Sequence, residues 1–438
     1  MKATETIKKS TVKANIDVGA LTAVPLSERK KKSFAETVVN ANKTYTISTA
    51  YDLNGATVML PVNVTLQFTG GGHISNGTIV GRNTIIRADR RVFFDLNVRG
   101  TFDCPGNVAW FADGSEVEDT QWGIFVRQRN DDTKNIQLAL DSDFRELHFP
   151  PKPFYITDTL TLRMEKRLIL HGSPMKLPMA SAGAEMRNTS ILFSDLNICL
   201  LRIAVNEKPE RQHSVAIEGG NFDVSLCKNY SSSCIELRTD NDEKMWGVAI
   251  NTALKGRDGN KYGCGIDINP VECAREAYNY AYASNIRINA DVCNFGIGIR
   301  ATNYIDLSTG HYFNWCTDLT IDGSIAGCPL AIDTNVEDAD IRASIQAGYF
   351  FDNISNQKPL IRYTGAFRAS VASKIYDLST AGFVTMENDT SSCVTKYSNQ
   401  YALEITRPEA TVTAYGAFRS FYLSSNRMGK MCVIGDII

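Results

Sequence analysis

The 438-residue sequence has no long hydrophobic run, no marked excess of charge and no closely paired cysteines. The absence of an apolar stretch of about 18 residues excludes a transmembrane helix. Lys and Arg number 46 against 48 Asp and Glu, which leaves a net charge of -2. That balance argues against binding to nucleic acid or to an anionic membrane by bulk attraction. We therefore expect a folded protein with neither of these partners.

The start of the chain and its cysteines indicate where the protein is made. Residues 1–45 are polar, include the basic run 29–32, and lack the apolar core of a signal peptide. The eleven cysteines are dispersed and contain no CxxC pair, which favours buried thiols over disulfides or a zinc site. Both features predict synthesis in a reducing cytoplasm. Residues 1–45 are interpreted as an attachment arm, with a disordered tail as the alternative.

From about Thr46 onward, short runs alternate between apolar and polar residues. The segments 64–68 (Val-Thr-Leu-Gln-Phe) and 285–292 (Asn-Ile-Arg-Ile-Asn-Ala-Asp-Val) are examples. Gly and Asn, which tolerate positive φ, separate such runs within the block 70–102. The runs follow one another too closely for helices between them. The pattern therefore predicts an all-β protein.

The strand candidates fall into two sets that recur at similar spacings. Members of the first set lie 33, 22 and 26 residues apart, at Asn285, Asp318, Asp340 and Ala366. Members of the second set lie 35 and 30 residues apart, at Cys293, Cys328 and Lys358. A period of roughly 20–35 residues built from short strands is typical of a β-solenoid, whose stacked coils share one core. A β-sandwich is the alternative, although it favours strands about every 8–12 residues.

One segment has the periodicity of a helix instead. Ile136, Ala139 and Leu140 are spaced to share one helix face. The Asp-Asp-Thr sequence at 131–133 offers N-cap oxygens and favourable charge at the helix start. We expect this short helix to cover the open apolar end of the stack, with its acids acting as caps and not as catalysts.

The same region resembles the start of pectate-lyase-like right-handed β-helices. The resemblance rests on four motifs: Asp-Asp-Thr-x-x-Ile-Gln-x-Ala-Leu at 131–140, Leu-His-Phe-Pro at 147–150, Phe-Tyr-Ile at 154–156 and Leu-Ile-Leu-His-Gly at 168–172. Two turns depart from the family pattern, because Arg-Gln-Arg-Asn at 127–130 and Pro-Pro-Lys-Pro at 150–153 stand where the family has glycine-containing turns. The resemblance implies a right-handed parallel β-helix with one N-terminal capping helix.

A second resemblance concerns the block Gly-Gly-Gly-His-Ile-Ser-Asn-Gly-Thr-Ile-Val-Gly at 70–81. It is similar to an N-terminal module of tail proteins from phages of gut Bacteroidota, crAss-like phages included. The module also occurs in carbohydrate-active β-helix proteins of their hosts. The resemblance implies a tail fibre or tailspike protein in the virion, made in the host cytoplasm and probing host surface polysaccharide.

These observations divide the chain into four parts. Residues 1–45 form the arm that docks on other virion proteins, and residues 46–125 form a small N-terminal β-solenoid module. Residues 126–392 form the main parallel β-helix. The aromatic-rich residues 393–438 form a C-terminal β segment that closes the rod or a homotrimer.

Aromatic residues at outward positions are the first candidates for glycan contact. If the segment Ala-Tyr-Asn-Tyr-Ala-Tyr is a strand, Tyr278, Tyr280 and Tyr282 share one face, whereas in a helix they scatter. Tyr and Trp combine an apolar ring with a hydrogen-bonding group, which suits them to contact sugars. Trp246 is a further candidate. A subunit contact or a place in the core is the alternative role for these residues.

Acidic residues at outward positions are the second group of candidates: Asp267, Asp291, Asp322 and Asp333. Glycoside hydrolysis needs two carboxylates about 5 Å apart for retention or about 6.5–9.5 Å apart for inversion. A lyase needs a base, often with Ca²⁺ held by carboxylates. The sequence alone does not align these acids, so solvated surface acids are the default. Asp267 and Asp291 are predicted to contact glycan.

The sequence contains no HExxH, GxSxG, P-loop or EF-hand motif, so no metal or other cofactor is expected and no catalytic residue is assigned. The predicted function is that of a virion structural protein that binds host polysaccharide. A polysaccharide depolymerase, either hydrolase or lyase, on the same scaffold is the alternative. A bacterial carbohydrate-active enzyme is a third possibility, but it would need an export signal.

Overall fold

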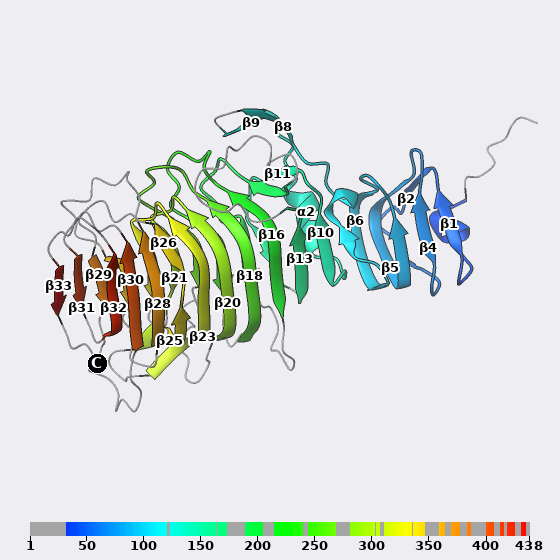
Figure 1. Cartoon of the computed structure of the whole chain (residues 1–438). Coiled ribbons are helices and arrows are strands. Elements are labelled where there is room, and N and C mark those ends of the chain that lie inside the picture. Colours follow the sequence, from blue (N-terminus) through cyan, green and yellow to red (C-terminus); the bar gives the residue numbers. More distant parts are fainter. Residues whose placement is uncertain are drawn as a thin grey trace, which may run out of the picture.

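The computed structural model shows an elongated stack of β-strands with few helices, with the N-terminal strands at one end and the C-terminal strands at the other (Figure 1). It describes residues 32–120, 123–163, 165–172, 189–204, 214–239, 244–268, 281–302, 304–306, 311–334, 336–346, 359–363, 369–376, 383–386, 400–406, 412–415, 418–424 and 431–434. The all-β prediction is confirmed, and most of the predicted attachment arm lies outside the described residues.

The first six strands form a sheet of their own, which we call the N-terminal module. All its pairings are parallel, and β5 lies at the centre of the sheet, in contact with β2, β3, β4 and β6. The strands are β1 (Thr44–Ile47), β2 (Ala50–Asp52), β3 (Thr57–Met59), β4 (Thr65–Phe68), β5 (His73–Arg87) and β6 (Phe93–Phe102).

Asparagine residues form the corners of this module. Asn42, Asn63 and Asn83 have positive φ angles of 57°, 57° and 54° and stack on one another. The Asn63 amide donates to Asn42 Oδ1 at 2.9 Å, and the Asn83 amide donates to Asn63 Oδ1 at 3.3 Å. Asparagine tolerates the left-handed region better than most residues. The stacked amides therefore fix where each coil bends.

The predicted turns inside residues 70–102 need a correction. Asn76-Gly77 and Gly81-Arg82-Asn83 do not end strands, because β5 continues through both as one 15-residue element. Single residues with positive φ, such as Asn76 at 53°, bend the strand while its hydrogen bonds to neighbouring strands continue on either side. The turn residues were recognised correctly, but they mark corners within a strand.

The rest of the chain winds alternately through two long sheets, which we call the main stack and whose pairings are parallel except for the antiparallel pair of β22 and β23. A fifteen-stranded sheet follows the order β7, β10, β13, β16, β18, β20, β23, β25, β28, β30, β32, with β11, β14, β22 and β26 beside it. Its members are β7 (Gly106–Asn107), β10 (Glu146–Phe149), β11 (Pro153–Tyr155), β13 (Lys166–Leu170), β14 (Ile191–Phe193), β16 (Val215–Asp223), β18 (Lys244–Lys255), β20 (Ala281–Cys293), β22 (Tyr304–Asp306), β23 (His311–Ala326), β25 (Glu337–Ile341), β26 (Ser344–Gln346), β28 (Ala369–Tyr376), β30 (Gln400–Thr406) and β32 (Phe418–Ser424).

The second sheet has ten strands in strict chain order. They are β12 (Leu160–Leu162), β15 (Leu201–Ala204), β17 (Ser233–Arg238), β19 (Cys264–Ile268), β21 (Ile297–Ala301), β24 (Leu330–Thr334), β27 (Pro359–Tyr363), β29 (Phe383–Met386), β31 (Val412–Tyr415) and β33 (Met431–Ile434). Strands β30 to β33 extend both sheets without a break, so the described strands of residues 393–438 belong to the same stack.

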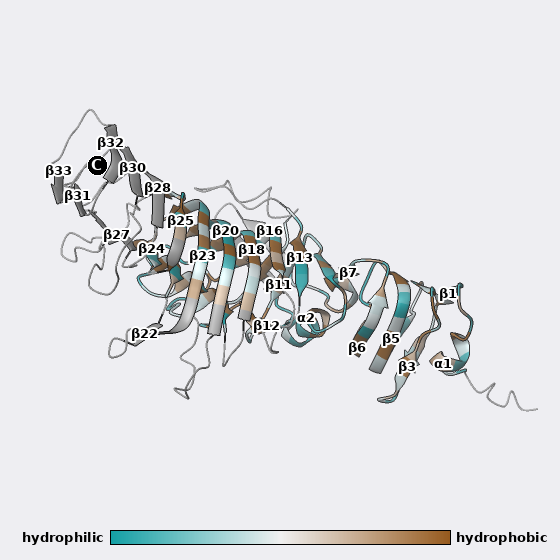
Figure 2. Ribbon diagram, turned by 90° about the horizontal axis from the view of Figure 1, so that it is seen from below, coloured by the Kyte–Doolittle hydropathy of each residue, from teal (hydrophilic) through white to brown (hydrophobic). Residues whose placement is uncertain are grey.

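Equivalent residues in successive coils form buried apolar columns. Ile266 pairs with Ile299, and Ile299 pairs with Ile332, and all three side chains are fully buried. Figure 2 shows the corresponding hydrophobic bands at matching heights on neighbouring strands. The spacing of 33 residues between these partners agrees with the predicted period. Each coil therefore buries its apolar face against the coils on either side of it.

Helices are few among the described residues, and none is long and apolar enough to cross a bilayer. They are α1 (Phe34–Thr37), α2 (Thr133–Leu140) and a 3₁₀ turn (Val108–Trp110). The predicted helix is confirmed as α2, with Ile136, Ala139 and Leu140 buried. It contacts β6 on one side and β12 on the other, so it lies between the N-terminal module and the main stack. A separate antiparallel hairpin consists of β8 (Glu116–Thr120) and β9 (Gly123–Gln128).

The predicted capping role of the 131–133 sequence is correct for one acid only. Asp131 Oδ1 accepts hydrogen bonds from the backbone and hydroxyl of Thr133, at 3.0 and 2.5 Å. Asp132 occupies the N-cap position, but its side chain makes no capping bond. It accepts instead from the backbone N–H of Gly114 at 3.0 Å. The Asp132 carboxylate that the sequence predicted to cap the helix therefore bonds to the loop at Gly114 instead.

The eight cysteines whose side chains the structure describes are all free thiols, and seven of them are buried. Burial raises the pKa of Cys316 and Cys328 to about 12, so both remain protonated at neutral pH. These thiols fill space in the core as small apolar groups, in agreement with their interpretation from the sequence.

Candidate functional site

The predicted aromatic residues are placed only in part. Tyr278 and Tyr280 lie outside the described residues. Tyr282 belongs to β20, which selects the strand alternative at this position, and its backbone pairs with Lys244 and with Trp315 on the neighbouring strands. Trp246 on β18 is 36% exposed and can reach a ligand.

The four predicted acids separate onto the two sheets of the main stack. Asp267 and Asp333 lie on the ten-stranded sheet, two coils apart in one column with Arg300 between them. Asp291 and Asp322 lie on the fifteen-stranded sheet, where Asp291 pairs with Ser324 instead of another acid. The coil register therefore aligns only the first two.

That column is part of a longer row of charged residues, which we call the charge ladder: Arg202, Glu236, Asp267, Arg300 and Asp333. One member comes from each of five successive coils, on β15, β17, β19, β21 and β24. Neighbouring strands lie about 4.8 Å apart, so the carboxylates of adjacent members come within reach of each other and of the arginines.

Ion pairs hold the charge ladder together. Arg202 Nε donates to Glu236 Oε2 at 2.7 Å. Arg300 Nε donates to Asp267 Oδ1 at 2.9 Å, and a second Arg300 nitrogen contacts Asp267 Oδ2. The Ser233 hydroxyl also donates to Asp267 Oδ2, at 3.0 Å. Hydrogen bonding to Asp267 raises the pKa of Arg300 above its ordinary value.

The position of Asp267 corrects the prediction that it is a surface acid. Its residue exposure is 2%, and both carboxylate oxygens are occupied by Arg300 and Ser233. Burying a charge without a partner is costly, so this carboxylate is buried only because a two-point arginine contact compensates it. Asp267 thus stabilises the stack from within the charge ladder and does not face a ligand.

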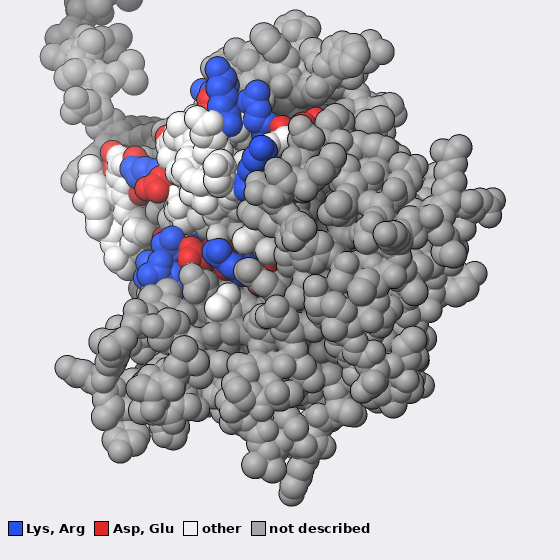
Figure 3. All heavy atoms as spheres, turned by 90° about the vertical axis from the view of Figure 1, so that its left-hand side faces the viewer, with Lys and Arg blue, Asp and Glu red and all other residues white. Residues whose placement is uncertain are grey.

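Asp322 takes part in a smaller charge cluster. Arg342 lies between Asp322 and Asp340, at 3.5 and 3.3 Å. In the end-on view of Figure 3, cations and anions lie side by side within the small part of the face that is not grey. Many surface charges therefore have a neighbour of opposite sign, in keeping with the nearly equal numbers of acidic and basic residues in the chain.

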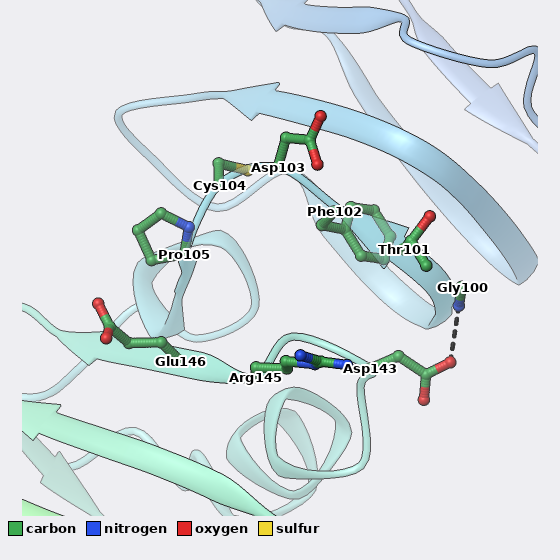
Figure 4. A pocket seen from close by; sticks show the side chains of 9 residues that line it. All are labelled: Gly100, Thr101, Phe102, Asp103, Cys104, Pro105, Asp143, Arg145 and Glu146. Carbon is green, nitrogen blue, oxygen red and sulfur yellow. Dashed lines mark hydrogen bonds between the residues drawn. The ribbon is translucent and has the colours of Figure 1, made fainter.

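A cavity of about 500 Å³ opens where the N-terminal module meets the main stack (Figure 4). Its lining comes from the end of β6, the loop to β7, the loop between α2 and β10, and the first residue of β10. The residues are Gly100, Thr101, Phe102, Asp103, Cys104, Pro105, Asp143, Arg145 and Glu146.

The acids of the cavity are largely committed to structural contacts. Asp143 Oδ2 accepts from the Gly100 backbone at 2.6 Å, which ties the main stack to the module (Figure 4). Glu146 contacts His148 and Arg167, at 2.6 and 3.2 Å. Burial raises the pKa of the Cys104 thiol, which is therefore a poor nucleophile. The cavity accordingly lies at a joint between two parts of the fold, with Asp143 and Glu146 held in these contacts.

Among the described residues, no group of three His, Cys, Asp or Glu side chains could hold a metal ion. Comparisons of the chain with protein-family models, with curated proteins and with solved structures return no match.

Proposed function

We propose that this protein is a structural component of a phage virion, a tail fibre or tailspike, that binds host surface polysaccharide. The observation that carries the proposal is the long uninterrupted stack. Two sheets, parallel except for β22, run from β7 to β33 and form a rod with an N-terminal module at one end. Such a rod offers repeated side-chain positions along its length, which suits contact with a repeating polymer.

The proposal includes a finer description of the fold and assembly. The coils form a right-handed parallel β-helix, as the large majority of parallel crossover connections are right-handed. Three chains associate into a homotrimer, and residues 1–45 dock on other virion proteins. Light scattering on the purified chain should give three times the monomer mass of 48.4 kDa. A stable monomer at micromolar concentration would refute the trimer.

The charge ladder favours binding over catalysis. Both oxygens of Asp267 are engaged by Arg300 and Ser233, and Glu236 is paired with Arg202. A nucleophile or general acid needs a carboxylate that can reach the scissile bond. Here the arginines already engage the carboxylates that such a reaction would use.

The test is to incubate the protein with capsular polysaccharides from a panel of gut Bacteroidota strains. We expect retention of the polymer without new reducing ends or unsaturated uronates. Progressive release of fragments would instead establish the alternative, a depolymerase. That alternative draws support from the alignment of Glu236 and Asp267 on adjacent coils, and it predicts loss of the release in a Glu236→Gln, Asp267→Asn variant.

A further inference from the structure

Four loops stack on one another along one corner of the main stack. They join the fifteen-stranded sheet to the ten-stranded sheet and span residues 194–200, 224–232, 256–263 and 294–296. The Lys255 carbonyl accepts from the backbone of Val224 at 2.9 Å, and the Tyr262 carbonyl accepts from Gly296 at 2.9 Å. The loops are therefore direct neighbours, one per coil.

These loops carry an unusual set of exposed side chains, which we call the corner surface: Leu196, Lys228, Arg257, Lys261 and Tyr262. Tyr262 is 69% exposed and Leu196 is 41% exposed, and the three cations are also exposed. No other large apolar side chain in the described residues is as exposed as Tyr262. Exposed aromatic groups of this kind mark contact sites more often than isolated aliphatic ones do.

The three cations of the corner surface differ from the arginines of the charge ladder. Lys228, Arg257 and Lys261 have no ion pair with any described residue, whereas the arginines of the charge ladder are paired. The four loops contain two acids. Asp195 is bound by Arg129 and Tyr155, and Asp258 accepts a hydrogen bond from Asn294. Asp258 offsets one of the three cations, so the four loops carry a surplus of positive charge in a chain whose net charge is -2.

The loops hold these side chains on a rigid backbone. The Asn197 side chain accepts from the backbones of Ser231 and Ser232, at 2.8 and 3.0 Å, and so fixes the loop that carries Lys228. A Cβ added at Gly296 would lie 2.6 Å from the Lys261 carbonyl oxygen, so the loop that carries Tyr262 presses closely on the next coil. A preorganised surface loses less entropy when it binds.

We propose that the corner surface binds an acidic polysaccharide, one that carries carboxylates or other anionic groups along its chain. The inference rests on the proposed function and specifies the class of glycan. Lys228 and the loop of Arg257 and Lys261 come from adjacent coils, about 4.8 Å apart along the stack, so a polyanion lying along the rod meets several cations in turn. The ring of Tyr262 supplies an apolar face for a sugar ring beside them.

The test measures binding of the full-length protein to polygalacturonate, to neutral dextran and to a DNA duplex. We expect polygalacturonate to bind best, and its affinity to fall at least tenfold between low and high salt, because exposed ion pairs are screened. A Lys228→Ser, Arg257→Ser, Lys261→Ser variant should lose roughly ten- to hundredfold in affinity. Tyr262→Ala should lose roughly threefold to tenfold without changing the salt dependence.

The matched control is an Arg82→Ser, Arg87→Ser, Arg90→Ser variant, which removes the same charge from exposed positions on the N-terminal module. It should keep the wild-type affinity. Equal losses in the two triple variants, equal binding of dextran, or tighter binding of DNA would overturn the inference. If host capsules bind but neutral and acidic ones bind alike, only this inference fails. If no capsule binds at all, the proposed function fails with it.

Discussion

The N-terminal module and the main stack build the same kind of parallel coil with different corner chemistry. In the module, Asn42, Asn63 and Asn83 stack in the left-handed region and bond through their amides. In the main stack, Gly247, Asn285 and Asp318 occupy one equivalent corner, also with positive φ. Both regions therefore need residues that accept positive φ at their corners. The row of hydrogen-bonded asparagine amides is an additional feature of the module.

The two regions also use charge differently. The module bends on neutral amides, whereas the main stack carries a charge ladder whose central acid, Asp267, is buried. A neutral amide can be left partly solvated at little cost, but a buried carboxylate depends on its partner. The module should therefore tolerate loss of a ladder residue better than the main stack does. Four predictions test and sharpen this contrast.

The largest effect is expected where the two regions meet. Phe93 is 2% exposed and packs against Phe68 of the module and against Trp110 and Phe111 beyond it, with ring centroids 5.1 to 6.3 Å apart. Phe93→Ala should lower the free energy of unfolding by about 3–5 kcal/mol, because it leaves a cavity between the three remaining rings. Urea unfolding followed by tryptophan fluorescence measures the loss.

The neighbouring Phe94→Ala is the control for this prediction, because Phe94 is only half-buried and should cost clearly less. If module and main stack are coupled through Phe93, one unfolding transition shifts as a whole. Two transitions, of which only the first moves, would show that the regions unfold independently.

Breaking the charge ladder should have an effect of similar size. Arg300→Met removes the partner of buried Asp267, and we expect a loss of about 3–5 kcal/mol in unfolding free energy. Arg202→Met frees Glu236, whose side chain is more exposed at 13%, and should cost about 1 kcal/mol. Adding Asp267→Asn to Arg300→Met should recover part of the loss. Equal losses of unfolding free energy for Arg300→Met and Arg202→Met would show that burial of the acidic partner does not decide the cost.

The asparagine ladder of the module should be less sensitive. Asn63→Ala removes two amide hydrogen bonds and forces a β-carbon-bearing residue without a polar side chain into the left-handed region, for a loss of about 2–3 kcal/mol. Asn63→Gly loses the same hydrogen bonds, but glycine adopts positive φ without strain. It should therefore cost about 1 kcal/mol less than Asn63→Ala. Thermal unfolding of the pair separates the two contributions. Identical stabilities would show that positive φ is not a constraint here.

The smallest effect concerns pH at the start of α2. Burial raises the pKa of Asp132 to about 6, against hydrogen bonding from Gly114 that favours the charged form. Because the folded pKa lies above the unfolded one, this group adds stability below about pH 4 that is lost as the pH rises through 6. We expect a change of about 1–2 kcal/mol across that range. Asp132→Asn should remove this pH dependence of the unfolding free energy and stabilise the protein above pH 6.

Asp131→Asn is the matched control with the opposite sign. Burial opposes ionisation of Asp131, but hydrogen bonds from Thr133 and Thr157 outweigh it and hold its pKa below the ordinary value. Its substitution should therefore reduce stability at neutral pH and leave stability at acidic pH nearly unchanged. Chemical unfolding at a series of pH values compares the two variants directly.

Much of the fold could be predicted because its signals are local. The alternation at 285–292 lies within β20, the run at 64–68 contains β4, and the apolar face of 136–140 became the buried face of α2. Each of these depends on side-chain periodicity over a few residues, which the chain carries wherever it folds. Repeat spacing then indicated which strands would stack.

The site was predicted far less well, for a physical reason. Whether Asp267 faces solvent depends on Arg300, which lies 33 residues away in sequence and one coil away in space. The corner surface was missed because Lys228 and Tyr262 share no local pattern. An unpaired cation can be identified only when the surroundings of every other charge are known.

The sequence by itself determined the strand content, the coil period and the apolar columns, since these follow from short-range alternation and from residues that accept positive φ. Only the tertiary structure decided the register between coils. Register selects which charges become partners, which carboxylate is buried and which cations stay free, because ion pairing requires atoms within a few ångströms of each other. Those choices separate the charge ladder, which stabilises the rod, from the corner surface, which is available to a ligand.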